Sequence, residues 1–421
     1  MKVYIKTYGC TLNQADSDII RSVLQRDGAE IAEEESDADV MVVNTCTVKK
    51  ATSQKILYKL NKLDKSGRKL VVTGCMAGAN RDLIERYAPG ASIITTPNID
   101  RINEVALDAQ DGWRNVVDSY KKTNRLSLLE PGDGVIAKIP VSDGCLSSCS
   151  FCETKFARGM LNSFPEETII KAIETSVRMG AREVQLTSQD MGAYGADRNT
   201  NIARLMEQIK LIPGDFKVRV GMLNPDHLHK YFDAFADAIE DERFYKFVHI
   251  PVQSGSNSVI SAMGRSCTIE QFEQHVADLR GRIPGVTIET DIIVGFPTER
   301  ESDFEETVDF IRRAKPEVTN ISRFAARPHT SASKVKQNST ETIKERSNTL
   351  SRVVRQVQHH INDRFIGKKF DVIITESNEK SFNGRNSSYR QVVVERNGTD
   401  MQIGSTYSLM IRSASANVLY A

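Results

Sequence analysis

Short apolar runs rich in β-branched residues alternate with helical patterns along most of this chain, and this alternation restricts the fold more than any other feature. In the first hundred residues, strands are predicted at Val3–Tyr8, Val40–Asn44, Leu70–Thr73 and Ser92–Thr96, with helices between them at Asp16–Asp27, Lys49–Leu63 and Arg81–Tyr87. Strand–helix–strand units form parallel sheets with right-handed connections. The N-terminal part is therefore predicted to be an α/β domain with a doubly wound parallel sheet.

A second strand–helix series begins after the polar stretch Arg114–Asn124. Its predicted strands are Val135–Val141, Glu183–Thr187, Lys217–Val220, Phe247–Pro251, Thr287–Val294 and Asn320–Phe324, with helices such as Pro165–Met179, Ile202–Ile209 and Ile269–Arg282 between them. Six such units are too few for a closed eight-stranded barrel. We therefore expect a partial (β/α)6 barrel that is open on one side.

The last part of the chain changes character. After a predicted helix at Glu341–Arg364, short alternating strands are predicted at Phe370–Thr375, Arg390–Glu395, Met401–Ile403 and Ser408–Ile411, separated by the turn sequences FNGRNSS and RNGTD. This pattern indicates a small β-barrel, which either binds nucleic acid or covers a neighbouring domain. The predicted division is an N-terminal α/β domain at 1–112, a linker at 113–134, the partial barrel at 135–340, a connecting helix at 341–366 and the β-barrel at 367–421.

Three cysteines directly follow predicted parallel strands of the N-terminal sheet. Cys10 follows the first strand, Cys46 the second and Cys75 the third. Because the carboxyl ends of parallel strands lie along one edge of the sheet, where open α/β sheets bind ligands, we expect the three thiols to lie close together. The alternative is three unrelated thiols, since free cysteines are commonly buried.

A second set of three cysteines lies within the single segment VSDGCLSSCSFCETKFARG at 141–159. Cys145, Cys149 and Cys152 have the spacing C-x₃-C-x₂-C. A 4Fe–4S cluster normally takes one cysteine per iron, so three cysteines leave one iron open to a ligand that the protein does not supply. Zinc takes four protein ligands, and disulfide frameworks belong to short secreted chains. The loop therefore predicts a 4Fe–4S cluster with an open iron, and the N-terminal set predicts a second one.

Composition restricts the environment but not the substrate. The net charge is +1, the hydrophobic content is 40% and the charged content is 26%, as in a globular protein. The chain has no apolar run of the roughly 20 residues needed to cross a bilayer, so no membrane association is expected. Thiolate ligands require a reducing compartment, which indicates the cytoplasm. Lys344 to Lys369 carries seven Lys/Arg against two acidic residues, which is compatible with a phosphate backbone or with an ordinary helix surface.

Polar residues at the carboxyl ends of the barrel strands are candidates for ligand contact. We expect cofactor binding at Ser188, Gln189, Asp190, Asn224, Gln253 and Gly295, although each could instead support a loop. The residues expected to contact substrate are Lys155, Arg158, Arg327 and Tyr389. His249 is interpreted as a buried histidine with a partner, and Cys267 as a buried thiol.

These residues together resemble the radical S-adenosylmethionine (SAM) methylthiotransferases over nearly the whole chain. The resemblance rests on the cysteines in TYGC, NTC and GC ahead of the C-x₃-C-x₂-C loop, followed by a TRAM-type β-barrel. The segments CETKFARG (152–159), LTSQDMGAYG (186–195) and HIPVQSGS (249–256) look like the archaeal and eukaryotic branch. That branch modifies N6-threonylcarbamoyladenosine at position 37 of tRNA, next to the anticodon.

The resemblance implies roles for both cysteine sets. Cys145, Cys149 and Cys152 would hold a 4Fe–4S cluster whose open iron binds SAM, and reductive cleavage of SAM would give a 5′-deoxyadenosyl radical that attacks carbon 2 of the adenine. Cys10, Cys46 and Cys75 would hold an auxiliary 4Fe–4S cluster that delivers the sulfur, with a second SAM supplying the methyl group. The implied product is 2-methylthio-N6-threonylcarbamoyladenosine, and the partners are tRNA, an electron donor and a sulfur source.

Other functions fit parts of the pattern. The chain could methylthiolate another modified adenosine or a ribosomal protein, or it could be an RNA-binding electron carrier with two clusters. A zinc-bearing RNA-binding protein is a third possibility. Two residues depart from the family pattern, Cys267 where an aromatic residue is common and His329 where glycine is common.

Overall fold

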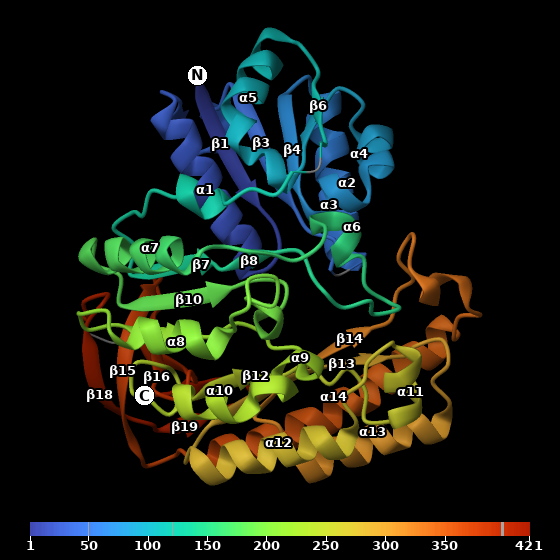
Figure 1. Ribbon diagram of the computed structural model, residues 1–421, viewed down its shortest axis with the longest axis vertical. Helices are drawn as coiled ribbons and strands as arrows, with labels where there is room; N and C mark the ends of the chain where they lie inside the picture. Colours follow the sequence, from blue (N-terminus) through green and yellow to red (C-terminus); the bar gives the residue numbers. More distant parts are fainter. Residues whose placement is uncertain (49, 120, 397–399) are drawn as a thin grey trace.

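A six-stranded parallel sheet forms the N-terminal part of the computed structural model, which describes residues 1–48, 50–119, 121–396 and 400–421 (Figure 1). The strand order is β2-β1-β3-β4-β5-β6. The strands are β1 (Lys2–Thr7), β2 (Glu30–Ile31), β3 (Val40–Thr45), β4 (Lys69–Gly74), β5 (Ser92–Ile94) and β6 (Val116–Val117). Helices α1 (Thr11–Arg26) and α5 (Ile102–Asp111) pack on one face, and α2 (Lys50–Lys65) and α4 (Arg81–Tyr87) on the other. The doubly wound arrangement is confirmed.

Two details of this part differ from the prediction. The segment 113–134 contributes β6, which pairs with β5 at the edge of the sheet, so this stretch is partly built into the N-terminal domain. Helix α1 begins at Thr11, five residues before the predicted start at Asp16, because the turn into the helix follows Cys10 directly. Lys49, the first residue of the predicted second helix, and Tyr120, in the predicted linker, lie outside the described residues.

Six parallel strands form the central part, as predicted. They are β7 (Ile136–Pro140), β10 (Glu183–Thr187), β11 (Lys217–Arg219), β12 (Phe247–His249), β13 (Thr287–Val294) and β14 (Val318–Arg323). They make two sheets, β11-β10-β7 and β12-β13-β14, joined where Val218 accepts a hydrogen bond of 2.9 Å from the backbone of Tyr245. The covering helices are α7 (Glu166–Arg178), α8 (Ile202–Lys210), α10 (Phe232–Ile239), α12 (Ile269–Arg282) and α13 (Glu301–Ala314). The result is an open (β/α)6 barrel below the N-terminal domain in Figure 1.

Helix α14 (Thr340–Asp363) leads to a curled, mixed C-terminal sheet with the order β18-β15-β16-β17-β20-β19. Its strands are β15 (Lys369–Ser377), β16 (Ser381–Asn386), β17 (Gln391–Glu395), β18 (Thr406–Met410), β19 (Ser413–Ala414) and β20 (Leu419–Tyr420). This sheet agrees with the predicted small β-barrel. Within the described residues, none of the helices of the chain combines the length and apolar character that a membrane span requires.

Two predictions for the C-terminal sheet were wrong. The sequence FNGRNSS was read as a turn but lies mostly in β16, where a Cβ on Gly384 would overlap the backbone oxygen of Ile373 on β15. This glycine therefore permits close approach of two strands rather than a turn. Met401–Ile403 was predicted as a strand but precedes β18. The turn RNGTD includes residues 397–399, which lie outside the described residues.

Shorter elements complete the chain and join its parts. The short strands and helices are β8 (Ser142–Asp143), β9 (Asn162–Ser163), α3 (Cys75–Ala79), α6 (Thr154–Arg158), α9 (Pro225–Leu228) and α11 (Asn257–Ala262). Helix α3 of the N-terminal domain packs against α6 of the barrel (Figure 1). The helices lie so close that a Cβ on Gly78 would overlap the backbone oxygen of Ala157.

Candidate active site

The N-terminal cysteines lie on three adjacent loops at the carboxyl edge of the sheet. Cys10 follows β1, Cys46 follows β3 and Cys75 begins α3 directly after β4. A Cβ on Gly9 would lie 3.0 Å from Sγ of Cys46, so the loop that carries Cys10 rests on Cys46. Topology has therefore brought together thiols that are far apart in sequence, as predicted.

Asn13 connects these three loops, and sequence reasoning missed it. Its Nδ2 donates hydrogen bonds of 2.8 Å to the backbone oxygens of Tyr8 and Thr45, and its Oδ1 lies 3.6 Å from Sγ of Cys75. Asn13 is fully buried. One side chain thus links the loops that follow β1, β3 and β4, although nothing in its sequence surroundings distinguishes it from a polar residue of a helix.

The N-terminal thiols are free and differ in exposure: Cys10 is exposed, Cys46 is buried and Cys75 is intermediate. Burial, together with the neighbouring Cys75 and Cys10 thiols, raises the pKa of Cys46 to about 11. Burial also raises the pKa of Cys75, although the Arg158 guanidinium counteracts this effect. The raised pKa values show that buried thiolates beside one another are unfavourable. A positive group that replaced the thiol protons would compensate these negative charges, so the arrangement fits a cationic centre.

The second set of thiols lies on the loop between β8 and α6. Cys145, Cys149 and Cys152 are free and half-buried. Gly144 has a φ of +72°, and a Cβ there would overlap the backbone oxygen of Met160, so the loop requires glycine immediately before its first cysteine. Burial, together with the nearby Asp190 charge, raises the pKa of Cys145 to about 11. Burial raises the pKa of Cys149 as well, opposed by Arg265.

Polar residues at the carboxyl edge of the barrel support the loop that carries Cys145, Cys149 and Cys152. Asn224 donates a hydrogen bond of 2.8 Å to Oγ of Ser147, within the loop, and accepts one of 2.7 Å from Arg265. Arg265 also lies 3.9 Å from Sγ of Cys149 and was not predicted from the sequence. Asp190 accepts backbone hydrogen bonds from Gly192 and Asn224 at 2.8 and 2.9 Å. Asn224 therefore supports the loop directly, and Asp190 supports it through the backbone of Asn224.

The remaining cofactor candidates have different surroundings. Oγ of Ser188 accepts a 3.1 Å hydrogen bond from the backbone of Asp190. Oε1 of Gln189 is buried and has no hydrogen-bond partner among the described residues. Gln253 has a φ of +77°, and its backbone pairs with β13. A Cβ on Gly295 would overlap Ile343 of α14, so close helix packing explains this glycine without a ligand.

Three of the four substrate candidates, Lys155, Arg158 and Arg327, lie beside the cysteine loops. Nζ of Lys155 donates hydrogen bonds of 2.8 and 3.1 Å to Leu146 and Ser148, across the cysteine loop. Arg327 donates a 2.7 Å hydrogen bond to the backbone oxygen of Val48, two residues after Cys46. Arg327 thus lies between the barrel and the N-terminal cysteines.

Tyr389 lies at the end of the barrel opposite the cysteine loop. Its hydroxyl donates a 3.1 Å hydrogen bond to Glu183, the first residue of β10, and its ring packs against Tyr245 and Phe247. The amino-terminal end of a barrel strand faces away from the carboxyl edge that carries the cysteine loop. This placement does not agree with substrate contact at the cysteines.

Arg158 also differs from its predicted role, because it is only 3% exposed. Its guanidinium pairs with Asp16 and Asp143 and therefore belongs to a buried cluster that also contains Arg125. Burial disfavours the charge of Asp143, but the Arg125 and Arg158 guanidiniums hold the pKa of this carboxyl below its usual range. The cluster joins α1 of the N-terminal domain to β8 and α6 of the barrel, and the sequence pattern did not reveal it.

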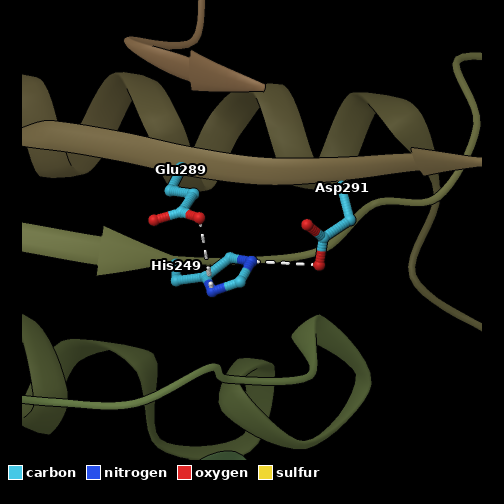
Figure 2. Close-up of side chains that lie close together, drawn as sticks. All are labelled: His249, Glu289 and Asp291. Atoms are coloured by element: carbon cyan, nitrogen blue, oxygen red, sulfur yellow. Dashed lines mark hydrogen bonds and ion pairs between the residues drawn. The ribbon is translucent and has the colours of Figure 1, made fainter. Parts of the chain in front are cut away.

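A second polar group lies inside the barrel, on strands β12 and β13. Figure 2 shows Glu289 and Asp291 pointing from the same strand toward His249. Nε2 of His249 lies 3.0 Å from Asp291, and Nδ1 lies 4.0 Å from Glu289. Burial would lower the pKa of His249, but the two carboxylates together raise it. This histidine is a partnered interior residue, in line with the sequence interpretation, and Cys267 is likewise buried.

Comparison with known families and proteins gives a consistent picture. The model of the uncharacterized protein family UPF0004 matches residues 2–96, and that of the Radical SAM superfamily matches residues 139–311. The chain is 39% identical to a probable threonylcarbamoyladenosine tRNA methylthiotransferase of Pyrococcus abyssi, over 94% of this chain and 93% of that protein. It is 35% identical to the human threonylcarbamoyladenosine tRNA methylthiotransferase, over 94% of this chain and 70% of the human protein.

Solved structures agree on the fold. The radical S-adenosylmethionine methyltransferase TsrM of Kitasatospora setae, solved with cobalamin and a [4Fe-4S] cluster, matches with a TM-score of 0.59 and 14% identity, over 79% of this chain and 73% of that one. The cobalamin-dependent radical enzyme OxsB matches with a TM-score of 0.53 and 13% identity, over 85% and 56%. At these identities the likeness shows a shared arrangement of the N-terminal α/β domain and the barrel and nothing about the reaction.

Proposed function

Because the chain belongs to the threonylcarbamoyladenosine tRNA methylthiotransferase family, we propose that it methylthiolates carbon 2 of N6-threonylcarbamoyladenosine at position 37 of tRNA. The observation that carries the proposal is the pair of cysteine sites. One is a C-x₃-C-x₂-C loop on a Radical SAM barrel, and the other lies on the N-terminal sheet, with short helices from the two sites in direct contact. A two-cluster electron carrier would also hold its clusters close together, so the Radical SAM match and the named relatives favour the enzyme over the carrier.

The Radical SAM match implies one 4Fe–4S cluster and SAM, and we propose the auxiliary cluster in addition. Cys145, Cys149 and Cys152 would hold the first cluster. The N-terminal set would hold the second, and its free, clustered thiols fit a cationic centre. When bound, these groups supply the radical that breaks the adenine C–H bond and the sulfur that replaces the hydrogen, chemistry that no side chain provides.

The protein residues in this proposal position the cofactors and exclude water. Asn224, Arg265 and Asp190 fix the cysteine loop through the contacts described above. Of the residues proposed for cofactor binding, Gln189 is best placed, because a buried oxygen without a partner is costly unless a bound group donates to it. Ser188, Gln253 and Gly295 lie at the same carboxyl edge of the barrel, and we also propose them for cofactor contact. Gly295 would contribute only its backbone.

The substrate would approach across the junction of the two domains. Lys155 and Arg327 both lie on the barrel side of this junction and would contact the phosphates of the anticodon loop. Phe156, on α6, is 50% exposed and lies 5.5 Å from the ring of His329. Exposed rings beside a reaction site suit an unpaired base, which proteins bind by stacking. A tRNA substrate and the need for reduced thiolates both favour a cytoplasmic location.

The test uses the anaerobically reconstituted full-length chain, SAM, a strong reductant and tRNA that carries threonylcarbamoyladenosine. We expect the digested nucleosides to gain a methylthio group by mass spectrometry, together with formation of 5′-deoxyadenosine. Transcripts that lack the threonylcarbamoyl group serve as the control. SAM cleavage without a methylthiolated nucleoside would redirect the proposal to another substrate, and absence of SAM cleavage would favour the electron carrier.

A further inference from the structure

One buried side chain reaches from the cysteine loop to the N-terminal cysteines. Arg158 ends α6, six residues after Cys152, yet its Nε donates a hydrogen bond of 3.4 Å to Sγ of Cys75 on α3. The two cysteines belong to different domains. Arg158 is therefore close in sequence to the ligands of one proposed cluster and contacts a proposed ligand of the other.

The guanidinium of Arg158 is held in place on every side. Nη2 donates to Asp16 at 2.5 Å and to Asn13 at 2.8 Å, and Nη1 lies 3.4 Å from Asp143. The Arg158 side chain is 0% exposed and the Asp16 side chain 2%. Because the two carboxylates compensate the buried charge, the Nε–H can remain directed at the sulfur.

We propose that Arg158 is a positioning residue that donates a hydrogen bond to the Cys75 ligand sulfur and thereby raises the reduction potential of the N-terminal cluster. The inference rests on the proposed function, which assigns a cluster to this site. Hydrogen bonds to ligand sulfurs and nearby positive charge stabilise the reduced, more negative form of an iron–sulfur cluster. The same contact fixes the sulfur-donating site relative to the loop that begins at Cys145.

Arg125 provides a matched control within the same charged cluster. It is as buried as Arg158 and pairs with Asp16 and Asp143, the same two carboxylates. Among the described residues, its guanidinium hydrogen bonds go to these carboxylates and not to a cysteine sulfur. Arg125→Lys disturbs the hydrogen bonds of the charged cluster and the domain contact, whereas Arg158→Lys also removes the contact with the sulfur.

The test measures the potential of the N-terminal cluster directly. In the full-length chain with Cys145, Cys149 and Cys152 replaced by alanine, only this cluster contributes to the electron paramagnetic resonance signal. We compare Arg158→Lys, Arg158→Gln and Arg125→Lys by redox titration, each variant with about four irons per chain. We expect both Arg158 variants to have a lower reduction potential than the parent, and the decrease should be larger for Arg158→Gln than for Arg158→Lys. Arg125→Lys should leave the potential almost unchanged.

The conservative variant keeps the test decisive if the glutamine variant does not fold. Unchanged potentials in Arg158→Lys, with iron retained, would overturn the proposal. An equal shift in Arg125→Lys would also overturn it, because the effect would then come from the charge cluster and not from the sulfur contact. A parent chain that binds no iron at this site would contradict the auxiliary cluster of the proposed function, a result that is distinguishable from the other two.

Discussion

The two cysteine sites have the same number of thiols but are built in different ways. Cys145, Cys149 and Cys152 lie on one loop, whose shape depends on local contacts such as Gly144 against Met160. The N-terminal thiols come from three strand ends and meet only because the sheet is parallel and complete. Each site also has an arginine beside one thiol, Arg265 with a side chain 6% exposed and Arg158 with one 0% exposed. The thiols of the first site therefore come from one segment, although barrel residues support it, whereas those of the second depend on assembly of the whole sheet.

The largest effect that this comparison predicts is a separation of the two halves of the reaction. Cys149→Ala should abolish SAM cleavage and therefore all product. Cys46→Ala should retain 5′-deoxyadenosine formation but lose methylthiolation, because only the site that we propose to donate sulfur is changed. Each variant should fall from about eight irons per chain to about four. Chromatography of 5′-deoxyadenosine, nucleoside mass spectrometry and iron analysis check this prediction.

Cys267→Ala is the matched control for these cysteine variants. Cys267 is also a buried free thiol, with Sγ 3.6 Å from the backbone oxygen of Thr268, and it belongs to neither site. The Cys267→Ala variant should retain both proposed clusters and full activity. If Cys46→Ala lost SAM cleavage as well, the two sites would not have separate tasks and the comparison would fail.

The same difference explains what could be read from the sequence. The cysteine loop was recognisable because its ligands and spacing are local, and the N-terminal set was recognisable because strand ends can be predicted from apolar runs. The roles of Asn13 and of the Arg158–Asp16 pair come from side-chain contacts between residues far apart in the chain. Such contacts cannot be predicted from the spacing of residues in the sequence. The misread strand at β16 has a similar cause, since Gly384 signals a turn in sequence but close strand approach in the fold.

The contact between the two sites can be tested separately from the sites themselves. Gly78→Ala places a Cβ against the backbone of Ala157, so α3 must move away from α6. We expect a loss of about 1–3 kcal/mol in stability, as for other overpacked positions. Both clusters and SAM cleavage should remain, but methylthiolation should fall, because the radical and the sulfur are no longer correctly placed. Thermal unfolding and the ratio of methylthiolated nucleoside to 5′-deoxyadenosine measure these two effects.

Gly281→Ala is the control, because Gly281 also lies in a helix but has nothing within 4 Å of the added Cβ. It should be neutral or stabilise the protein by about 0.5–1 kcal/mol, since alanine favours helix. An unchanged product ratio in Gly78→Ala would mean that the relative position of α3 and α6 does not limit sulfur transfer.

The smallest expected effect lies inside the barrel, at a group that belongs to neither cysteine site. Burial would lower the pKa of His249, but Asp291 and Glu289 raise it above the ordinary value of 6.5. A histidine with a raised pKa in the folded state stabilises the protein fully below its unfolded pKa, and this contribution is lost as the pH rises through the folded pKa. We therefore expect the difference in melting temperature between the parent and His249→Gln to shrink as the pH rises above about 6.5.

His359→Gln serves as the control for the His249 prediction, because the His359 side chain is 56% exposed on α14 and lies 3.7 Å from Asp363 at the surface. Its melting temperature should follow the parent at every pH, since surface ion pairs contribute little. Iron content should be unchanged in both histidine variants, because the ion pairs described for these histidines are with carboxylates outside the two cysteine sites. Parallel melting curves for the parent and His249→Gln would show that the carboxylates do not stabilise the charged imidazole. A loss of iron in His249→Gln would instead show that the cysteine loop depends on the barrel interior and is less local than its spacing indicates.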